Sequence, residues 1–385
     1  MFNSDLIKKF QSLKTPFYFY DVELLKKTLD ELKSQSSKRN YIVHYAVKAN
    51  ANEKILKIIN EYGIGADCVS GNEILRSLKC GFLGSNIAFA GVGKSDEEIL
   101  IGLKNDIFSF NVESVQELEV INSLAKSLNK NANIALRINP NVDAKTHRYI
   151  TTGLEENKFG INQSDLPSII EKLKSLTNLK LTGLHFHIGS QVKDLDVFKG
   201  LCIRVNEVQN WFYDHQIEFE HINAGGGLGI DYENPDENSI PDFDSFFSVF
   251  DKFLELKPNQ QLHFELGRTI VGQCGSLISK VLFIKEGVNT NFAILDAGMT
   301  ELIRPALYQS FHKIENLTST GIQKKYDVVG PICESSDTFG KAVILPETKR
   351  GDLIAIRSTG AYGEIMSSGY NLRPKAESVF SDELK

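Results

Sequence analysis

The sequence predicts a (β/α)8 TIM-like barrel joined to a β-sandwich or Greek-key-like domain, and three observations support this fold class. The chain has 385 residues, which suggests two domains. From residue 41 onward, short β-rich segments alternate with helical patterns, as in a parallel barrel. After residue 270, β-rich segments follow one another without helices of comparable length, as in an all-β domain. A doubly wound open sheet is the alternative for the alternating part.

The alternating part contains enough strand candidates to close a barrel. Eight of them begin near Tyr41, Gly65, Asn86, Phe108, Asn133, Leu181, His221 and Gln261. Helical patterns between them include residues 53–62, 72–79 and 113–128, and Ser95 with Glu98 forms a capping box for a further helix. A polar insertion at about residues 140–165 follows the fifth strand, and we expect it to cover the barrel mouth.

The part after residue 270 predicts a second, all-β domain. Strands are expected at about residues 276–285, 292–296, 326–329, 342–345 and 353–357. The N-terminal segment 16–20 could add a strand to the same domain. We therefore assign residues 25–268 to the barrel, and residues 1–24 with 269–385 to the β domain.

Composition restricts the possible partners and the compartment. The net charge is −6, so the chain lacks the basic surface of a nucleic-acid-binding protein. Five scattered cysteines without a CxxC pair argue against a disulfide framework and favour a reducing, cytoplasmic compartment. No apolar run is long enough for a membrane span, and no secretory signal is visible.

Lys48 is the most informative residue of the sequence, because it ends the apolar segment YIVHYAVKAN. A lysine buried there without a partner would tend to lose its proton. A neutral lysine amine attacks aldehydes, which is how Schiff-base enzymes use it. The alternative is a lysine whose charged end reaches solvent at the end of the strand.

Other polar residues and glycines also fall at the ends of predicted strands, where barrel enzymes place their active sites. Asp67 ends the second strand and Arg137 the fifth, while His185 and His187 lie in the sixth, within GLHFHIGS. The seventh strand leads into AGGGLG, and the eighth into Glu265, Leu266, Gly267 and Arg268. The loops after strands seven and eight often bind phosphate through backbone amides, so Gly226, Gly227, Gly267 and Arg268 are candidates for that role.

The two histidines face the same way on a strand, so they could in principle hold a metal ion. A third ligand would have to be Asp67 or Glu265. We favour instead one core histidine and one histidine at the barrel mouth, with Ser190 available to donate to a phosphate, and we expect no metal.

A lysine for an aldehyde, a phosphate cradle and a carboxylate together describe a pyridoxal 5′-phosphate site. A carboxylate such as Glu265 keeps the pyridine nitrogen protonated and makes the ring a strong electron sink. That environment favours breaking a bond to Cα, and it disfavours an amino-acid racemase.

Eight ordered motifs carry a resemblance that runs almost from end to end. They are YAVKAN (45–50), HFHIGSQ (185–191), NAGGGLG (223–229), ELGR (265–268), IRPALY (303–308), CESSD (333–337), GAYG (360–363) and SGYNLRP (368–374). With these motifs the chain resembles the fold-type III pyridoxal-phosphate decarboxylases of the alanine-racemase-like barrel group. Within that group it is most similar to the diaminopimelate decarboxylases, which form lysine and carbon dioxide from meso-2,6-diaminopimelate in lysine biosynthesis.

The resemblance implies a role for each matching residue. Lys48 would bond the cofactor covalently, His187 would stack on its ring and Glu265 would pair with the ring nitrogen. Phosphate or the nearby end of the substrate would be held by Ser190, Gly227, Gly267, Arg268 and Tyr362. Substrate would be bound by Arg268, Arg304, Tyr308, Glu334, Tyr362 and Tyr370, and Cys333 would protonate the product. The CES segment would reach into a partner's site, so the β domain would supply substrate-binding and dimer-interface residues to a homodimer.

The chemistry of the substrate is consistent with this set of residues. Diaminopimelate has a distal ammonium and a distal carboxylate, which match Glu334 and the pair Arg268 and Arg304. Ornithine and arginine lack the distal carboxylate, so two arginines disfavour them. Carboxynorspermidine carries a carboxylate and stays open as an alternative substrate, and a non-catalytic homologue should have lost Lys48 or Cys333.

Overall fold

The computed structural model describes residues 2–142 and 158–384, and its contacts divide the chain into two compact units. The barrel unit comprises residues 29–229 and 242–267, and the β unit comprises residues 1–28, 230–241 and 268–385. Helix α2 (Val22–Ser37) contains the first boundary between them. Most of the insertion expected to cover the barrel mouth, residues 143–157, lies outside the described residues.

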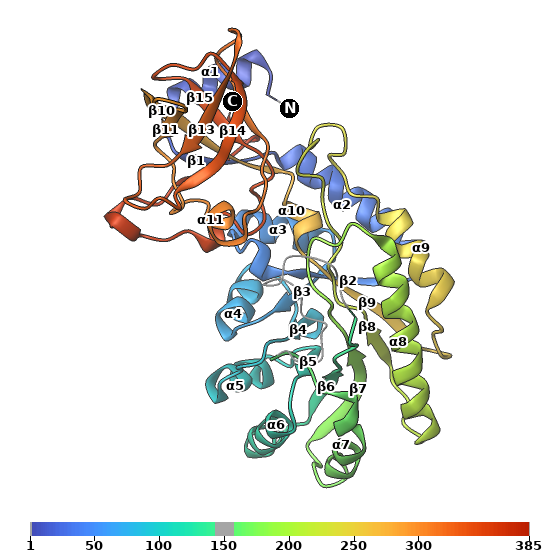
Figure 1. Ribbon diagram of the computed structural model, residues 1–385. Helices are drawn as coiled ribbons and strands as arrows, with labels where there is room; N and C mark the ends of the chain where they lie inside the picture. Colours follow the sequence, from blue (N-terminus) through green and yellow to red (C-terminus); the bar gives the residue numbers. More distant parts are fainter. Residues whose placement is uncertain (1, 143–157, 385) are drawn as a thin grey trace. The chain divides into compact units, whose positions relative to one another are not determined.

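The barrel unit contains a closed ring of eight parallel strands, which confirms the predicted fold class and excludes the open sheet. Outer helices connect most of the successive strands (Figure 1). The strands are β2 (Ile42–Ala46), β3 (Gly65–Cys68), β4 (Ile87–Phe89), β5 (Ser109–Val112), β6 (Ala132–Arg137), β7 (Leu179–His185), β8 (His221–Asn223) and β9 (Gln261–Leu266). The helices are α3 (Glu53–Glu61), α4 (Gly71–Lys79), α5 (Asp96–Lys104), α6 (Val115–Ser127), α7 (Leu166–Leu173), α8 (Leu195–Asp214) and α9 (Phe243–Phe253).

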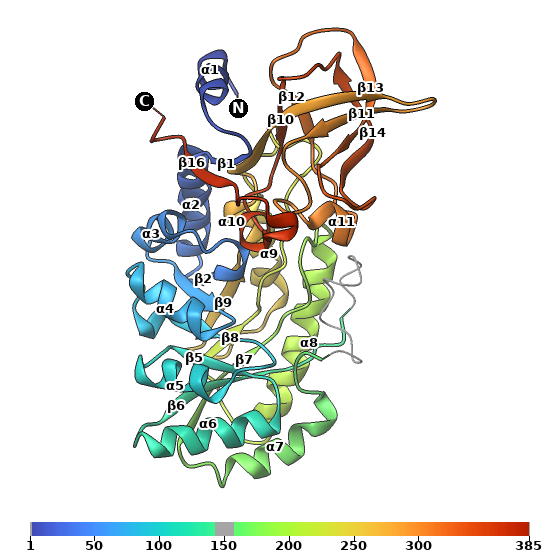
Figure 2. The ribbon, with the colours of Figure 1, turned by 90° about the vertical axis from the view of Figure 1, so that its left-hand side faces the viewer.

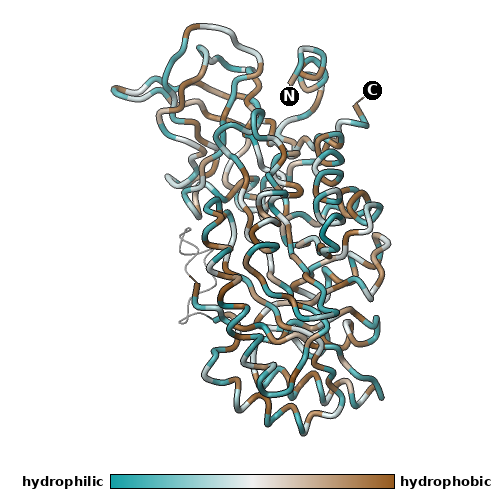
Figure 3. The backbone as a smooth tube through the Cα atoms, turned by 90° about the vertical axis from the view of Figure 1, so that its right-hand side faces the viewer, coloured by the Kyte–Doolittle hydropathy of each residue, from teal (hydrophilic) through white to brown (hydrophobic). Residues whose placement is uncertain are grey.

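Local sequence explains where these helices begin and which face they bury. The predicted capping box is present at the start of α5, where Ser95 and Glu98 satisfy each other's backbone amides. Figure 3 shows hydrophobic and hydrophilic residues mixed along the coiled parts of the chain. In α9, for example, Phe246 and Phe250 pack against Phe264 of β9 with ring centroids 5.5 and 4.8 Å apart. Burial of such faces holds each helix against the strands.

Three buried histidines lie inside the barrel toward the N-terminal ends of the strands. His44 Nε2 lies 2.9 Å from His263 Nδ1, and His44 Nδ1 lies 3.2 Å from the Asn86 carbonyl oxygen. Phe108 stacks on His263 at 5.0 Å, and its ring centroid is 4.9 Å from that of His221. A Cβ at Gly183 would lie 2.3 Å from the His221 ring, so this strand position must be glycine. We call His44, His221, His263 and Phe108 the barrel floor.

The β unit is built on an eight-stranded sheet in which β10 runs between several partners (Figure 2). Its strands are β1 (Phe17–Tyr20), β10 (Gly275–Glu286), β11 (Asn291–Leu295), β12 (Ile314–Asn316), β13 (Gln323–Val329), β14 (Thr338–Pro346), β15 (Leu353–Ile356) and β16 (Glu377–Phe380). The N-terminal segment joins this sheet as expected, because β1 pairs with β10 and with β16. Short helices α1 (Ser4–Ser12), α10 (Arg268–Val271) and α11 (Arg304–Tyr308) complete the unit.

The β unit has its own apolar core. Phe10 of α1 packs against Phe17 and Phe19 of β1, with ring centroids 5.4 and 4.9 Å apart. Ile278 of β10 and Leu353 of β15 belong to the same buried cluster. In the described part of the chain, no helix is both long and apolar enough to cross a lipid bilayer.

Candidate active site

Lys48 lies directly after β2, in the 3-10 turn Val47–Ala49. Its Nζ is 2.9 Å from Oδ2 of Asp67, the third residue of β3, and the Lys48 side chain is 36% exposed. Lys48 is therefore neither unpaired nor fully buried, because its amine lies beside the Asp67 carboxylate. Lys48 is instead an accessible amine beside a possible proton acceptor.

Asp67 has a raised pKa, which makes its carboxylate a better proton acceptor than an exposed one. Its pKa is raised to about 6, first by complete burial and then by the negative charge of Glu265, while Lys48 opposes the rise. Among the described residues, the buried Oδ1 of Asp67 has no hydrogen-bond partner. A buried polar atom without a partner is costly, so this oxygen is suited to a ligand that can donate a hydrogen bond.

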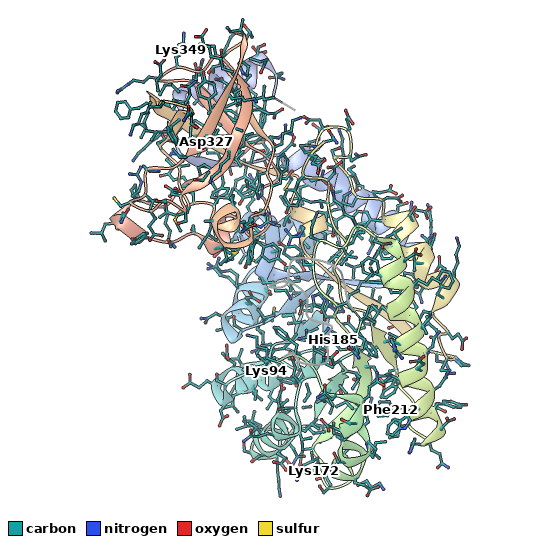
Figure 4. All side chains as sticks on the ribbon, in the orientation of Figure 1. Lys94, Lys172, His185, Phe212, Asp327 and Lys349 are labelled. Atoms are coloured by element: carbon teal, nitrogen blue, oxygen red, sulfur yellow. The ribbon has the colours of Figure 1, made fainter. Side chains whose placement is uncertain are left out.

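Glu265 lies in β9 and receives hydrogen bonds from side chains of three other barrel strands. Asn111 Nδ2 of β5 and Asn223 Nδ2 of β8 donate to Oε1 at 3.0 and 2.8 Å. His185 Nε2 at the end of β7 bonds to Oε2 at 2.9 Å (Figure 4 labels His185). Burial disfavours the ionised carboxylate, but His185 and Lys48 outweigh it and hold the pKa of Glu265 well below its usual range. Glu265 is thus a fixed negative charge.

His187 lies two residues beyond β7, beside the glycine run that follows β8. The Gly226 N–H donates to His187 Nδ1 at 3.3 Å, so the ring proton is on Nε2. Burial and the positive charges of Arg137 and Lys48 hold the pKa of His187 well below its usual value. His187 is therefore a neutral imidazole at the barrel mouth, whereas His185 is the core histidine, as the sequence indicated.

The glycine run is shaped for close approach of the backbone. A Cβ at Gly226 would lie 1.9 Å from the Glu265 carbonyl oxygen, and one at Gly227 (φ +114°) would lie 2.8 Å from that of Gly189. Gly267, next to Glu265 and Leu266 in the chain, packs tightly, since its Cβ would be 3.0 Å from that of Ala49. A surface without side chains lets an anion reach backbone N–H groups, so this run fits the predicted phosphate role. Ser190 follows Gly189 and is half-buried.

Lys94 is a more deeply buried lysine than Lys48, and it shows that burial alone does not identify the reactive lysine. Lys94, labelled in Figure 4, has a side chain that is 1% exposed. Its ammonium donates to Glu117 at 2.5 Å and to the carbonyl oxygens of Gly91 and Asn111, both at 2.8 Å. With three acceptors and no exposure, Lys94 is a structural cation, and Lys48 is the accessible one.

Arg137 ends β6 and forms a buried ion pair beside the mouth. Its Nη1 lies 2.7 Å from Glu113 Oε1, and its guanidinium lies over the Phe159 ring at 4.8 Å. Glu113 also accepts the Gly91 and Gly160 backbone N–H groups. This pair fixes the ends of neighbouring strands and adds positive charge near His187.

The β unit brings the two predicted arginines together on one phenol. Arg268 Nη1 and Arg304 Nη1 both donate to the hydroxyl oxygen of Tyr232, at 2.7 and 2.9 Å. Arg268 also lies over the Tyr362 ring at 4.8 Å, and Tyr308 ends the short helix α11 that begins at Arg304. All four of Tyr232, Arg268, Arg304 and Tyr362 are buried or half-buried. The arrangement is a concentrated positive site suited to an anion.

Cys333, Glu334 and Tyr370 form a second group in the β unit, and it is exposed. Tyr370 is 47% exposed and hydrogen-bonds to Glu334, which raises the pKa of the phenol. The Cys333 backbone N–H donates to Asn371 Oδ1 at 3.3 Å, and the cysteine is free. These predicted substrate and proton-donor residues therefore lie at the surface of the single chain.

The sequence analysis missed several residues that organise these sites. Asn111 and Asn223 bind Glu265, although Asn223 stands in the quoted motif NAGGGLG. Asn223 ends β8 and Asn111 is the last residue but one of β5, so their position near strand ends could have signalled them. Tyr232 and His312 gave no such signal, because they lie in loops of no regular period. Within residues 2–142 and 158–384, no three His, Cys, Asp or Glu side chains are grouped to hold a metal ion.

Comparisons with known proteins connect this geometry to a family. Residues 23–272 match the pyridoxal-binding domain of pyridoxal-dependent decarboxylases. The chain is 59% identical to a diaminopimelate decarboxylase of Bacteroides thetaiotaomicron, over 98% of each protein. The crystal structure of the Helicobacter pylori enzyme complexed with L-lysine has a TM-score of 0.92 and 41% identity, covering 98% of this chain and 94% of that one. The crystal structure of diaminopimelate decarboxylase from M. jannaschii in co-complex with L-lysine has a TM-score of 0.90 and 34% identity, covering 97% of this chain and 89% of that one. The chain belongs to the diaminopimelate decarboxylase family of pyridoxal-dependent decarboxylases.

Proposed function

We propose that this chain is a carboxy-lyase that converts meso-2,6-diaminopimelate to L-lysine and carbon dioxide with pyridoxal 5′-phosphate, the last step of lysine biosynthesis. The observation that carries the choice of substrate is the buried pair Arg268 and Arg304 on the Tyr232 phenol. Two guanidinium groups favour a distal carboxylate and repel a distal ammonium. The names of the relatives, and the lysine bound in two of the similar structures, support the same substrate.

The residues of the barrel unit fit the cofactor. The glycine run carries no side chains that would keep a phosphate from its backbone N–H groups, and the unpartnered Asp67 Oδ1 is suited to a donor. In our proposal Gly226, Gly227, Gly267, Ser190 and Arg268 hold the phosphate end, His187 lies against the ring and Glu265 faces the ring nitrogen. Bound pyridoxal phosphate supplies an electron sink for the electron pair left at Cα when the carboxylate departs.

The barrel residues control the protons of the reaction. Lys48 must lose a proton from Nζ before it can attack an aldehyde, and Asp67 Oδ2 at 2.9 Å can accept it because its pKa is about 6. Ionised Glu265 keeps a proton on the ring nitrogen, and its three hydrogen bonds prevent it from turning away.

The residues of the β unit bind and orient the substrate. We assign the distal carboxylate to Arg268 and Arg304, with Tyr308 and Tyr362 beside them. Glu334 and Tyr370, which are hydrogen-bonded to each other, are assigned to the distal ammonium. Cys333 Sγ is assigned to return a proton to Cα after carbon dioxide leaves.

We propose that the enzyme is a homodimer in which each copy supplies Cys333, Glu334 and Tyr370 to its partner's site. Their exposure in the single chain supports this, because substrate-binding groups require a more enclosed surface. We place the enzyme in the cytoplasm, because its five cysteines are free.

Mixing two inactive variants tests the shared site. Lys48→Ala and Glu334→Ala proteins, unfolded and refolded together, should recover about a quarter of wild-type activity by random pairing in a symmetric dimer. Recovery close to zero, with dimers present by analytical ultracentrifugation, would show that each site belongs to one chain.

The function itself is tested by offering several substrates to the purified protein with pyridoxal phosphate. Meso-diaminopimelate, ornithine, arginine and carboxynorspermidine are supplied separately, and carbon dioxide and amine products are measured. Lysine from diaminopimelate, with the other three at least about a hundredfold slower, is expected from the unlike distal charges. Faster turnover of another substrate would retain the decarboxylase chemistry and reject this choice of substrate.

A further inference from the structure

Tyr232 contacts the guanidinium groups of both Arg268 and Arg304 through a single atom. It lies in the segment 230–241, next to the glycine run in the sequence but part of the β unit. Its phenol oxygen accepts Nη1 of Arg268 at 2.7 Å and Nη1 of Arg304 at 2.9 Å. The two nitrogens can therefore be no further apart than these two hydrogen bonds together.

Such close like charges need a compensating group. Burial and the charge of Arg268 lower the pKa of Arg304, and Tyr232 opposes that change. In the other direction, burial opposes ionisation of Tyr232, but Arg268 and Arg304 outweigh it and lower the pKa of its phenol. The phenol oxygen thus offsets part of the repulsion that would otherwise separate the arginines.

A neutral histidine, His312, is the second hydrogen-bond acceptor of Arg304 Nη1, beside the Tyr232 phenol. His312 Nδ1 lies 2.8 Å from the Arg357 carbonyl oxygen, so that nitrogen carries the proton and Nε2 accepts Arg304 Nη1 at 2.8 Å. Burial and the charge of Arg304 lower the pKa of His312 to about 3, which keeps it an acceptor. Both Nη1 protons of Arg304 are thereby used.

The remaining edge of Arg304 has the geometry for a carboxylate. Among the described residues, its Nε and Nη2 have no hydrogen-bond partner, and these two donors form one side of the guanidinium fork. The segment that carries Tyr232 is itself anchored, because Asp236 binds buried Arg357 through two hydrogen bonds of 2.7 and 3.1 Å. The hydrogen bonds of the arginines therefore hold the phenol oxygen of Tyr232, and the Asp236 ion pair holds the segment that carries it.

We infer that Tyr232 is a positioning residue that holds Arg268 and Arg304 together and turns the open edge of Arg304 toward a ligand carboxylate. It would thereby set the preference for substrates with a distal carboxylate. This inference rests on the proposed function, since it deepens the choice of substrate, and it assigns Tyr232 no part in the bond-breaking step.

Two ligands that differ only in the carboxylate test this role. L-Lysine and 1,5-diaminopentane are titrated into the holoenzyme by calorimetry, for wild type and Tyr232→Phe. The variant should bind lysine about tenfold more weakly and diaminopentane within about twofold of wild type, because only one ligand uses the arginines. The KM for diaminopimelate should rise by about the same factor as the lysine Kd, with kcat within about threefold.

Tyr326→Phe is the matched control. It also removes a buried tyrosine hydroxyl of the β unit, one that accepts the Thr348 backbone N–H at 3.1 Å, away from the arginines. This control should leave the lysine-to-diaminopentane preference unchanged. Equal losses for both ligands in Tyr232→Phe, or a preference changed as much in Tyr326→Phe, would overturn the positioning role.

The wild-type enzyme decides the question if Tyr232→Phe does not fold. The groups around the phenol are Arg268, Arg304 and His312, and Tyr308 and Tyr362 act on Arg268. In holoenzyme with 13Cζ-labelled tyrosine, one resonance should titrate below pH 10, and lysine but not diaminopentane should raise its pKa. No such resonance, or an equal response to both ligands, would contradict the inference. Failure to form lysine from diaminopimelate would instead reject the proposed function.

Discussion

The two ends of the barrel both contain buried histidines, and they use them in opposite ways. Next to the mouth, the core histidine His185 bonds to the Glu265 carboxylate at 2.9 Å and helps to keep it ionised. At the floor, His44 and His263 bond to each other and stack with Phe108, and neither ring is hydrogen-bonded to a carboxylate of the described residues. These histidines are all buried. The hydrogen-bond partner of each imidazole therefore decides whether the ring helps to keep a carboxylate ionised or packs only against other rings.

This difference indicates that the barrel mouth is the candidate active site and that the barrel floor is structural. The mouth concentrates Lys48, Asp67, His187 and Glu265, whose charges affect one another's pKa values. Burial lowers the pKa values of all three floor histidines, and His221 reaches about 3. We therefore expect substitutions at the mouth to change the reaction, and substitutions at the floor to change stability.

The largest effect should come from Lys48→Ala. Loss of the only group that we assign to covalent attachment should reduce kcat by at least about a thousandfold. The measurement is lysine formation with saturating cofactor. Lys57→Ala, which removes an exposed lysine of α3, is the control and should retain full activity. Turnover by Lys48→Ala within tenfold of wild type would reject the mechanism.

Glu265→Gln should have the next largest effect. The amide keeps the size of the side chain but removes the negative charge, so the ring nitrogen loses its proton and the electron sink weakens. We expect kcat to fall about a hundredfold, with cofactor still bound, as measured by turnover and cofactor absorbance. A rate near that of wild type would show that the charge of Glu265 is not used.

Acidification should lower the folding stability of the protein through His221 of the barrel floor. The His221 pKa is about 3 in the folded chain and near 6.5 when unfolded, so unfolding takes up protons below pH 6.5. Its contribution to stability is complete above pH 6.5 and falls by about 2 kcal/mol at pH 5. Urea midpoints at pH 7.5 and 5 should therefore differ less in His221→Phe than in wild type.

His215→Phe provides the comparison for that pH experiment. His215 is an exposed histidine directly after α8 and is not part of the barrel floor. Its replacement should leave the pH dependence of wild type unchanged. If His215→Phe and His221→Phe behave alike, the floor histidines are not the acid-sensitive element.

The sequence predicted the mouth better than its supports, and the reason is physical. Strand-end position indicated Lys48, Asp67 and Glu265, because a parallel barrel brings all strand ends to one face. The ion pair of Lys48 with Asp67 was not predicted, since Asp67 lies 19 residues further along the chain. Tyr232 meets Arg304 across 72 residues of sequence, and no local pattern encodes such a contact.

The fold class was predictable because periodicity is local. All eight barrel strands lie within a few residues of their predicted starts, and β10, β11, β13, β14 and β15 overlap the predicted segments. The short strands β12 and β16 were not predicted, since three- and four-residue segments carry little pattern of their own.

Chemical trapping of the cofactor tests the central claim, that the mouth of the barrel carries the reaction. The protein is incubated with pyridoxal phosphate, reduced with borohydride, digested and mapped by mass spectrometry. We predict one pyridoxyl group on the peptide that contains Lys48, and none on the buried Lys94. A label on another lysine, or no stoichiometric label, would contradict the account.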